Sequence, residues 1–251
     1  MREAKFTCSF IQPKIESLDS SFPIALNSAS SFIIDTNHFL GKLDYCKSVL
    51  NEQDLIYASS KKKESDQQQK IIARAILKIL LAKALKQSVH TIEIAKDANG
   101  KPFCPTAILS NIHFNISDAA NYVAIIIAQS VVGIDIETIQ PQFQYQDIAS
   151  LHFHQNEIQA LKNANDPLML FYRYWTRKES FLKLEGNGLT DYLNELDMTE
   201  GEKINKIHGL GPQGNYFVSS FFMNAHLMVS VSVPSLINQL RFFNYIANDL
   251  E

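Results

Sequence analysis

Two acidic residues, Asp135 and Glu137, lie two positions apart in the otherwise apolar segment Val132–Glu137. Alternate side chains of an extended strand share a face, so both carboxylates project to one side while Ile134 and Ile136 enter the core. Neighbouring carboxylates repel each other unless a proton or a cation lies between them. A solvated strand face also explains such a pair. Because unpaired charge is costly to bury among apolar strands, the pair is a candidate site for a hard cation such as Mg²⁺.

A second polar group follows about forty residues later. Glu179 and Lys183 are one turn apart in a predicted helix, on the same face. An ordinary surface ion pair, contributing roughly 0.2–0.5 kcal/mol, is one interpretation. Together with the strand carboxylates, however, they supply metal ligands, a base and a cation. Phosphoryl transfer needs these groups, because its catalysis consists mostly of positioning and charge neutralisation.

Two long helices are predicted to position these groups. The first has Asp66 as a possible N-cap and carries apolar residues at spacings of three and four as far as Leu85. The second begins at Asp166-Pro167, a capping residue followed by a proline whose missing N–H costs nothing at that position, and ends near Gly186.

Strands are predicted on both sides of these helices. Residues 111–117, 121–128 and 131–137 are joined by very short connections, which predicts an antiparallel meander, because parallel pairing needs a long crossover. Residues 216–223 and 226–233 predict a hairpin. The chain is therefore expected to be an α+β protein of two similar packed lobes, each an antiparallel sheet with a long helix. We place the N-terminal lobe at residues 1–128 and the C-terminal lobe at 129–251.

Composition excludes several classes of protein. The 251 residues carry a net charge of −3, whereas a nucleic-acid-binding domain usually carries clustered positive charge. The three cysteines, Cys8, Cys46 and Cys104, have neither a disulfide nor a zinc-site pattern. No uncharged stretch is long enough to span a bilayer, and the N-terminus lacks the apolar run of a signal peptide. We expect a cytoplasmic protein with no membrane or nucleic-acid partner.

Four ordered motifs carry a resemblance to a known family. They are Gly100-Lys101-Pro102, Phe114-Asn115-Ile116-Ser117, Gly133-Ile134-Asp135, and Trp175-Thr176-x-Lys178-Glu179-Ser180-x-x-Lys183 with the following Glu185-Gly186-Asn187-Gly188-Leu189. This arrangement resembles the 4′-phosphopantetheinyl transferase superfamily, in its larger, monomeric, surfactin-synthetase-activating type. The resemblance covers residues 70 to 190.

The resemblance implies an activity. Such an enzyme, a holo-[acyl-carrier-protein] synthase, transfers 4′-phosphopantetheine from coenzyme A to a serine of an apo acyl or peptidyl carrier protein, requires Mg²⁺ and releases 3′,5′-ADP. The family fold has two similar lobes with coenzyme A in the cleft between them, and a monomer is expected.

The resemblance also assigns roles to residues. Asp135, Glu137 and Glu179 would hold Mg²⁺. Glu179, or a water near the metal, would accept the proton of the carrier serine. Lys183 would bind or protonate the leaving 3′,5′-ADP.

Further residues would contact coenzyme A. Lys101 and Ser117 would bind its phosphates. A cation of the first helix also contributes in the family, and the sequence leaves three alternatives for it: Lys70, Arg74 and Lys78.

One residue departs from the family pattern. Asp118 follows Ser117 where the family has a histidine that meets the 3′-phosphate of coenzyme A. An ionised carboxylate repels a phosphate, so we expect weakened binding of the donor at this position. Asp118 also favours one alternative, a non-catalytic paralogue that binds carrier protein or coenzyme A without turnover. A different magnesium-dependent phosphate-transfer enzyme is the other.

Overall fold

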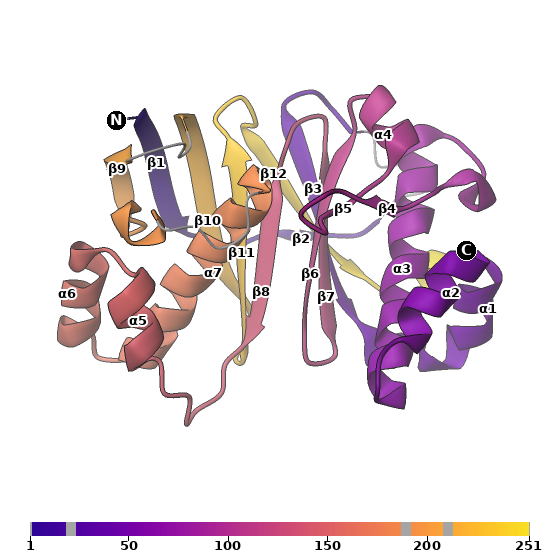
Figure 1. Ribbon diagram of the computed structural model, residues 1–251, viewed down its shortest axis with the longest axis horizontal. Helices are drawn as coiled ribbons and strands as arrows, with labels where there is room; N and C mark the ends of the chain where they lie inside the picture. The colour runs from indigo at the N-terminus through magenta and orange to yellow at the C-terminus, as the bar shows by residue number, and fades with distance from the viewer. Residues whose placement is uncertain (1, 19–23, 187–191, 208–212, 251) are drawn as a thin grey trace.

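The structure is a computed structural model that describes residues 2–18, 24–186, 192–207 and 213–250. Two five-stranded sheets stand side by side in Figure 1, and we call them the C-lobe sheet and the N-lobe sheet. The C-lobe sheet has the order β8 (Gly133–Thr138), β11 (Leu227–Pro234), β10 (Gly214–Asn224), β1 (Arg2–Phe10) and β9 (Gly201–Ile207). The N-lobe sheet has the order β2 (Ile15–Glu16), β12 (Gln239–Tyr245), β3 (Ser28–Asp35), β7 (Tyr122–Ala128) and β6 (His113–Ala119).

The helices and short elements complete the fold. A small hairpin is formed by β4 (Ala95–Lys96) and β5 (Pro102–Phe103). The α-helices are α1 (Leu43–Ser48), α2 (Glu52–Ser59), α3 (Glu64–Leu85), α4 (Pro105–Leu109), α5 (Gln146–His152), α6 (Gln155–Asn163) and α7 (Pro167–Glu185). Short 3₁₀ turns cover Thr36–Lys42, Val89–Thr91, Leu193–Glu195 and Ala247–Leu250. Within the described residues, no helix is both long and apolar enough to cross a bilayer. The expected α+β class of two lobes is confirmed.

Apolar faces of the two sheets meet in a shared core. In β11 the residues Val229 and Val231 pack with Ile33 and Ile126 of the N-lobe sheet. Because side chains alternate along a strand, Ser230 points the other way and meets α7. The N-lobe sheet likewise covers α3 with its outer face, through Phe32, Ile125 and their neighbours. The two long helices therefore lie on the outer faces of the stacked sheets (Figure 1).

The second long helix, α7, begins and ends as capping rules require. Asp166 caps α7 by accepting a hydrogen bond from the Met169 N–H, and Gly186 ends it in the left-handed conformation, as predicted. The first helix begins earlier than expected. It starts at Glu64, so Asp66 lies in the first turn and is not the N-cap. The negative charge of Asp66 there interacts favourably with the helix dipole. Of the predicted glycine-rich exit after α7, Asn187, Gly188 and Leu189 lie outside the described residues.

The predicted three-stranded meander is wrong in its third strand. β6 and β7 pair as an antiparallel hairpin, with Ser117 opposite Ala124. β8 instead leaves the N-lobe sheet and pairs with β11, so that Asp135 lies opposite Ser230. A connection of a few residues permits this change of sheet because the two sheets are stacked at that point. The predicted hairpin of β10 and β11 is confirmed.

The two ends of the chain exchange sheets. β1 runs parallel to β10 and antiparallel to β9 in the C-lobe sheet. β12 inserts between β2 and β3 of the N-lobe sheet, parallel to both. The division that we placed at residue 128 therefore falls between β7 and β8, while each chain end pairs within the other lobe's sheet. These terminal strands also make both sheets mixed, although antiparallel pairs dominate.

Candidate active site

A close contact between β8 and α7 brings the signature residues together. A Cβ atom added to Gly133 would lie 1.8 Å from the backbone oxygen of Ser180, so only glycine allows this approach. Hydroxyl pairs join the same helix to β11: Thr176 to Ser230 and Ser180 to Ser232, each at 2.7 Å between oxygens. Small polar residues thus hold α7 directly against the strands whose carboxylates it faces.

Asp135 is the centre of the site. Its side chain is buried, and its Oδ1 accepts hydrogen bonds from the Ser117 hydroxyl at 2.9 Å and from the Lys183 ammonium at 2.6 Å. Lys183 also donates to the Ser117 Oγ at 2.6 Å. The three residues come from β6, β8 and α7, so both lobes contribute to one cluster. Nearby, the Asn115 Oδ1 accepts the Ile134 N–H across the same junction at 3.0 Å.

Lys183 was one of two residues interpreted from sequence as a possible surface ion pair. In the structure its ammonium contacts Asp135, whose side chain is only 4% exposed, while the Lys183 side chain is 28% exposed. The contact is therefore a partly buried charge-assisted bond rather than an exposed helix pair. Such bonds are stronger than exposed ones because water screens them less.

Two more carboxylates lie within electrostatic reach of Asp135. Burial and the charges of Asp135 and Glu179 raise the pKa of Glu137 to about 7, although Lys183 and a hydrogen bond from Trp175 oppose the shift. Burial and the charge of Asp135 likewise raise the pKa of Glu179 to about 7. Burial also raises the pKa of Asp135, against the opposing effect of Lys183. The three carboxyls therefore resist ionising together beside the single ammonium of Lys183.

The donor set suits a hard cation, although it is not closed around one. Asp135 Oδ2 is buried and has no hydrogen-bond partner. Buried oxygens are rarely left unpaired, and a cation at this oxygen would satisfy it. In the part of the chain that the structure describes, no three acidic, histidine or cysteine side chains are gathered tightly enough to hold an ion. The expected metal residues Asp135, Glu137 and Glu179 nevertheless lie near one another. The Lys183 ammonium contacts Asp135.

Lys101 reaches α7 from the β4–β5 hairpin. Its ammonium donates to the backbone oxygens of Lys183 at 2.5 Å and Leu184 at 3.3 Å. Cations are favourable at the C-terminal end of a helix, where carbonyls lack intrahelical partners. Lys101 therefore ties the N-lobe to the last turn of α7, and the structure places it beside, but not in contact with, the Ser117–Asp135 cluster.

A basic pocket of about 170 Å³ lies on the N-lobe side of the cluster. Its wall includes Lys70, Arg74 and Lys96, together with Asp118. Lys70 donates a hydrogen bond to Asp118 Oδ1 at 2.5 Å, so the carboxylate that departs from the family pattern is neutralised by a residue of α3. The charge that remains in the pocket is positive.

An aromatic ring organises these cations. The Lys96 ammonium lies 4.5 Å from the centre of the Tyr57 ring, and the Arg74 guanidinium carbon 5.3 Å from it. Arg74 Nη1 is buried without a hydrogen-bond partner, although its Nε lies 3.4 Å from Asp54. Lys78, the third alternative from sequence, is buried in an ion pair with Asp54 at 3.0 Å and does not line the pocket.

Sequence reasoning missed three residues of this region. Tyr57 of α2 and Lys96 of β4 line the basic pocket. No local sequence pattern predicts that these two residues lie close together. Glu157 forms a fully buried ion pair with Lys178 at 2.9 Å. Lys178 stood in the signature without a role, and its two further bonds, to the oxygens of Leu193 and Leu196, show that it anchors α7 to the following segment.

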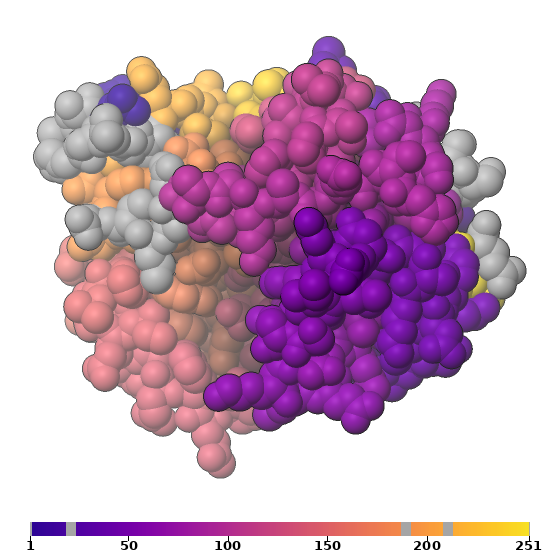
Figure 2. Space-filling model, turned by 45° about the vertical axis from the view of Figure 1, so that its right-hand side comes forward, coloured from indigo at the N-terminus to yellow at the C-terminus, as the bar shows by residue number. Residues whose placement is uncertain are grey.

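A hollow separates the two lobes on the face seen in Figure 2. Segments of the first half of the chain, in purple, form one side, and those near α5 and α6, in salmon, form the other. Orange atoms of the α7 region are visible in its floor.

Family models match the chain on both sides of this junction. Residues 41–130 match the N-terminal domain of 4′-phosphopantetheinyl transferase, and residues 131–222 match the 4′-phosphopantetheinyl transferase superfamily. The chain belongs to the 4′-phosphopantetheinyl transferase superfamily. The border between the two matches falls between β7 and β8, where the chain passes from one sheet to the other.

Individual relatives agree with this membership. The chain is 28% identical over 150 residues to the 4′-phosphopantetheinyl transferase Sfp of Bacillus subtilis, covering 56% of this chain and 65% of that protein. It is 33% identical over 126 residues to the 4′-phosphopantetheinyl transferase gsp of Aneurinibacillus migulanus, covering 49% and 51%. It is 28% identical over 140 residues to the L-aminoadipate-semialdehyde dehydrogenase-phosphopantetheinyl transferase of Mus musculus, covering 51% and 45%. The shared stretch spans less than two thirds of each relative's own length.

Proposed function

We propose that this chain transfers 4′-phosphopantetheine from coenzyme A to a serine of an apo acyl or peptidyl carrier protein. The serine oxygen attacks the phosphorus that carries pantetheine, the bond from that phosphorus to the bridging oxygen of the pyrophosphate breaks, and 3′,5′-ADP leaves. The observation that supports the proposal is the meeting of Ser117, Asp135 and Lys183 at the lobe junction, beside Glu137 and Glu179.

The residues divide the chemistry among them. Asp135, Glu137 and Glu179 are the proposed Mg²⁺ ligands, and the unpaired Asp135 Oδ2 supports this choice. A bound Mg²⁺ would neutralise the charge of the pyrophosphate. Glu179, or a water near the metal, is the proposed acceptor of the serine proton. Lys183 would bind the phosphate oxygen on which the leaving 3′,5′-ADP develops negative charge.

Coenzyme A is the proposed occupant of both sides of the junction. Its pyrophosphate would lie at Ser117 and Lys183, and its 3′-phosphate in the basic pocket of Lys70, Arg74 and Lys96. The unpaired Nη1 of Arg74 supports an anion there. Lys101, at the end of α7, remains a proposed phosphate contact.

Mass spectrometry of an apo carrier protein tests the transfer. Incubation with the chain, coenzyme A and Mg²⁺ should add the mass of one phosphopantetheine. Asp135→Asn and Glu137→Gln should abolish the gain while the fold remains, because each removes a negative ligand oxygen. Asp44→Asn, which changes a fully exposed carboxylate, is the matched control and should react normally. Absence of an adduct with several carriers would favour the non-catalytic alternative or another magnesium-dependent phosphate enzyme.

A comparison of two donors tests the basic pocket. Lys70→Met or Lys96→Met should raise KM for coenzyme A roughly tenfold, since each loses a charged phosphate contact. Neither should change KM for 3′-dephospho-coenzyme A, which lacks that phosphate. Asp118→Asn should lower KM for coenzyme A several-fold, because it frees the Lys70 ammonium for the phosphate, and should leave KM for the second donor unchanged. Lys47→Met, on the exposed surface of α1, is the control. Equal changes for both donors would move the 3′-phosphate out of this pocket.

A further inference from the structure

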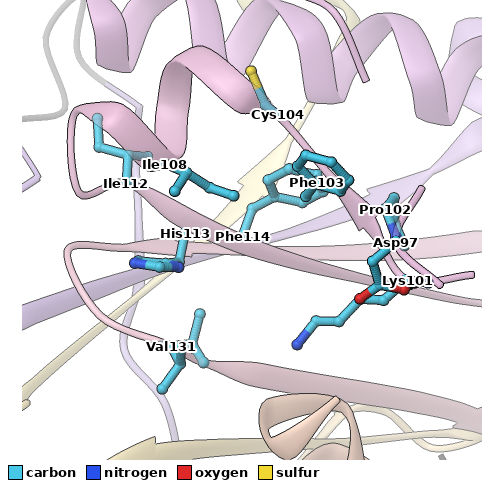
Figure 3. A pocket seen from close by; sticks show the side chains of 11 residues that line it. Asp97, Lys101, Pro102, Phe103, Cys104, Ile108, Ile112, His113, Phe114 and Val131 are labelled. Atoms are coloured by element: carbon cyan, nitrogen blue, oxygen red, sulfur yellow. Dashed lines mark hydrogen bonds between the residues drawn. The ribbon is translucent and has the colours of Figure 1, made fainter. Parts of the chain in front are cut away.

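A separate, larger cavity of about 330 Å³ lies beyond the β4–β5 hairpin (Figure 3). Its walls are mostly apolar and come from three elements: Phe103 beside the hairpin, Ile108 and Ile112 around α4, and Phe114 on β6, with Val131 closing the lower side in the view. Ile108 is 47% exposed and Val131 45% exposed, so the cavity opens between two partly bare apolar side chains. Its volume lies in the range of small-molecule sites.

Two polar groups face this cavity with hydrogen-bonding capacity to spare. Lys101 uses two of its three N–H groups on α7 carbonyls, and its side chain runs along the cavity in Figure 3. Among the described residues, the His113 ring has no hydrogen-bond partner. Burial and the charge of Lys101 lower the pKa of His113, so its imidazole is neutral at pH 7 and can donate or accept.

The cavity shares Lys101 with the proposed donor contacts but is separate from the carboxylate cluster and from the basic pocket. His113 and Ser117 share one face of β6 but are four residues apart, which corresponds to roughly 13 Å along a strand. The β4–β5 hairpin lies between this cavity and the basic pocket, and Pro102 contributes to both walls. A ligand here would therefore occupy neither the carboxylate cluster nor the pocket of Lys70.

We propose that this cavity is a second ligand site, which takes a small uncharged aromatic molecule with one hydroxyl or carbonyl oxygen. The rings of Phe103 and Phe114 provide aromatic packing for a flat body. The oxygen accepts the free N–H of Lys101 and bonds the ring of His113.

The choice of an uncharged ligand follows from the local charges. Burial lowers the pKa of Lys101, and the nearby carboxylates of Asp97 and Glu185 oppose that shift by balancing the charge of its ammonium. A carboxylate ligand would meet these two negative charges as well as the ammonium, and burial would add a desolvation cost. A neutral oxygen avoids both penalties. Because Lys101 also holds the end of α7, the bound oxygen is connected through one side chain to the helix that carries Lys183.

Calorimetry or ligand-observed NMR with 2-naphthol and the full chain, without coenzyme A, tests the proposal. We expect saturable binding with a Kd of roughly 0.1–1 mM, a range typical for so small a ligand. Ile108→Trp, which fills the cavity, should weaken binding at least tenfold, and His113→Leu should weaken it several-fold. Ile204→Trp, which adds the same ring to an exposed position of β9, is the matched control and should bind normally.

Several results would overturn the site. Binding that is absent, or unchanged in Ile108→Trp, would show that the cavity takes no such ligand. Binding of 2-naphthoate as tight as that of 2-naphthol would show that the charge argument is wrong. Thermal unfolding of each variant confirms that it is folded before binding is measured. Because no carrier protein or coenzyme A takes part, these outcomes are independent of the transfer assay.

Discussion

Lys183 serves both the stability and the proposed chemistry of the chain. Its ammonium is the only cation that the described hydrogen bonds place on the buried Asp135. A positive charge in this position reduces the cost of keeping three carboxylates together on one side of a core strand. In the proposed transfer, the same positive charge would stabilise the negative charge that develops on the leaving group. If the proposed transfer is correct, stability and catalysis both depend on this side chain, and substitution should affect both.

Lys183→Met is expected to lower kcat by orders of magnitude and to destabilise the chain by roughly 1–3 kcal/mol at pH 8, because Asp135 then loses its charged partner. The stability loss should shrink at pH 5, where Asp135, with its raised pKa, takes up a proton more readily. Chemical denaturation at the two pH values measures this. Lys162→Met, an exposed lysine of α6, is the control. A melting temperature that does not change at either pH would mean that the Lys183–Asp135 contact contributes nothing to folding.

The raised pKa values of Glu137 and Glu179 predict how stability depends on pH. In the metal-free folded chain both carboxyls keep their protons up to about pH 7, whereas in the unfolded chain they lose them near their ordinary pKa of 4.5. The unfolded state thus binds fewer protons in this window, so the free energy of unfolding falls as the pH rises from about 4.5 to about 7 and then levels.

Melting temperatures from pH 4.5 to 8, with EDTA and with MgCl₂, check this expectation. The stabilisation by Mg²⁺ should grow across the window, because ion binding needs the deprotonated carboxylates. A Glu137→Gln/Glu179→Gln double variant should flatten the metal-free profile between pH 4.5 and 7. An unaltered slope in that variant would assign the pH dependence to other buried groups.

At the scale of elements, the site depends on the distance between α7 and β8. Gly133→Ala places a methyl group against the Ser180 backbone oxygen, and a helix backbone cannot give way as a side-chain tip can. We expect a destabilisation of roughly 1–3 kcal/mol from overpacking and a large loss of transfer, since Glu179 and Lys183 move with the helix. Gly41→Ala, with open space around its Cβ position, should change stability by less than about 1 kcal/mol. Full activity of Gly133→Ala would show that the helix tolerates displacement.

The individual helices and strands also show how much of the fold can be predicted from the sequence. Asp166-Pro167 predicted the start of α7, and alternation in residues 227–233 predicted β11, because both signals are local. The facing side of Asp135 was also predictable from strand alternation. The partner of β8 was not, because a short connection fits a hairpin within one sheet and a step between two stacked sheets equally well.

The site shows the same division. The carboxylates and Lys183 lie within two short motifs, so their types and spacing indicated phosphate chemistry. The pairing of Lys70 with Asp118 and the ring of Tyr57 among cations arise from segments far apart in sequence. Only the tertiary structure reveals these two contacts. The first of them shows that the charge of Asp118, which the sequence predicts to repel a phosphate, is paired with the Lys70 ammonium.

At the scale of the whole molecule, three connections pass between the two sheets: residues 11–14, 129–132 and 235–238. A chain cut between Gln129 and Ser130 should therefore stay assembled, because each fragment contributes a terminal strand to the other's sheet. Co-expressed fragments 1–129 and 130–251 should copurify as a 1:1 pair, and each alone should be insoluble or unfolded. Fragments that fold separately and fail to associate would contradict this expectation.

The placement of β12 has a consequence for the way the chain is made. Ribosomes synthesise the N-terminal half first, and domains commonly fold as they emerge from the ribosome. Here the N-lobe sheet has a gap between β2 and β3 until residues 239–245 have been synthesised, and β1 waits for β9 and β10 before it can pair. The C-lobe sheet therefore cannot be completed before residue 234 is synthesised, nor the N-lobe sheet before residue 245, so strand edges of the first half of the chain stay unpaired through most of this stretch of synthesis. We therefore expect the unfinished chain to aggregate more readily than the finished protein, because its unpaired strand edges are exposed.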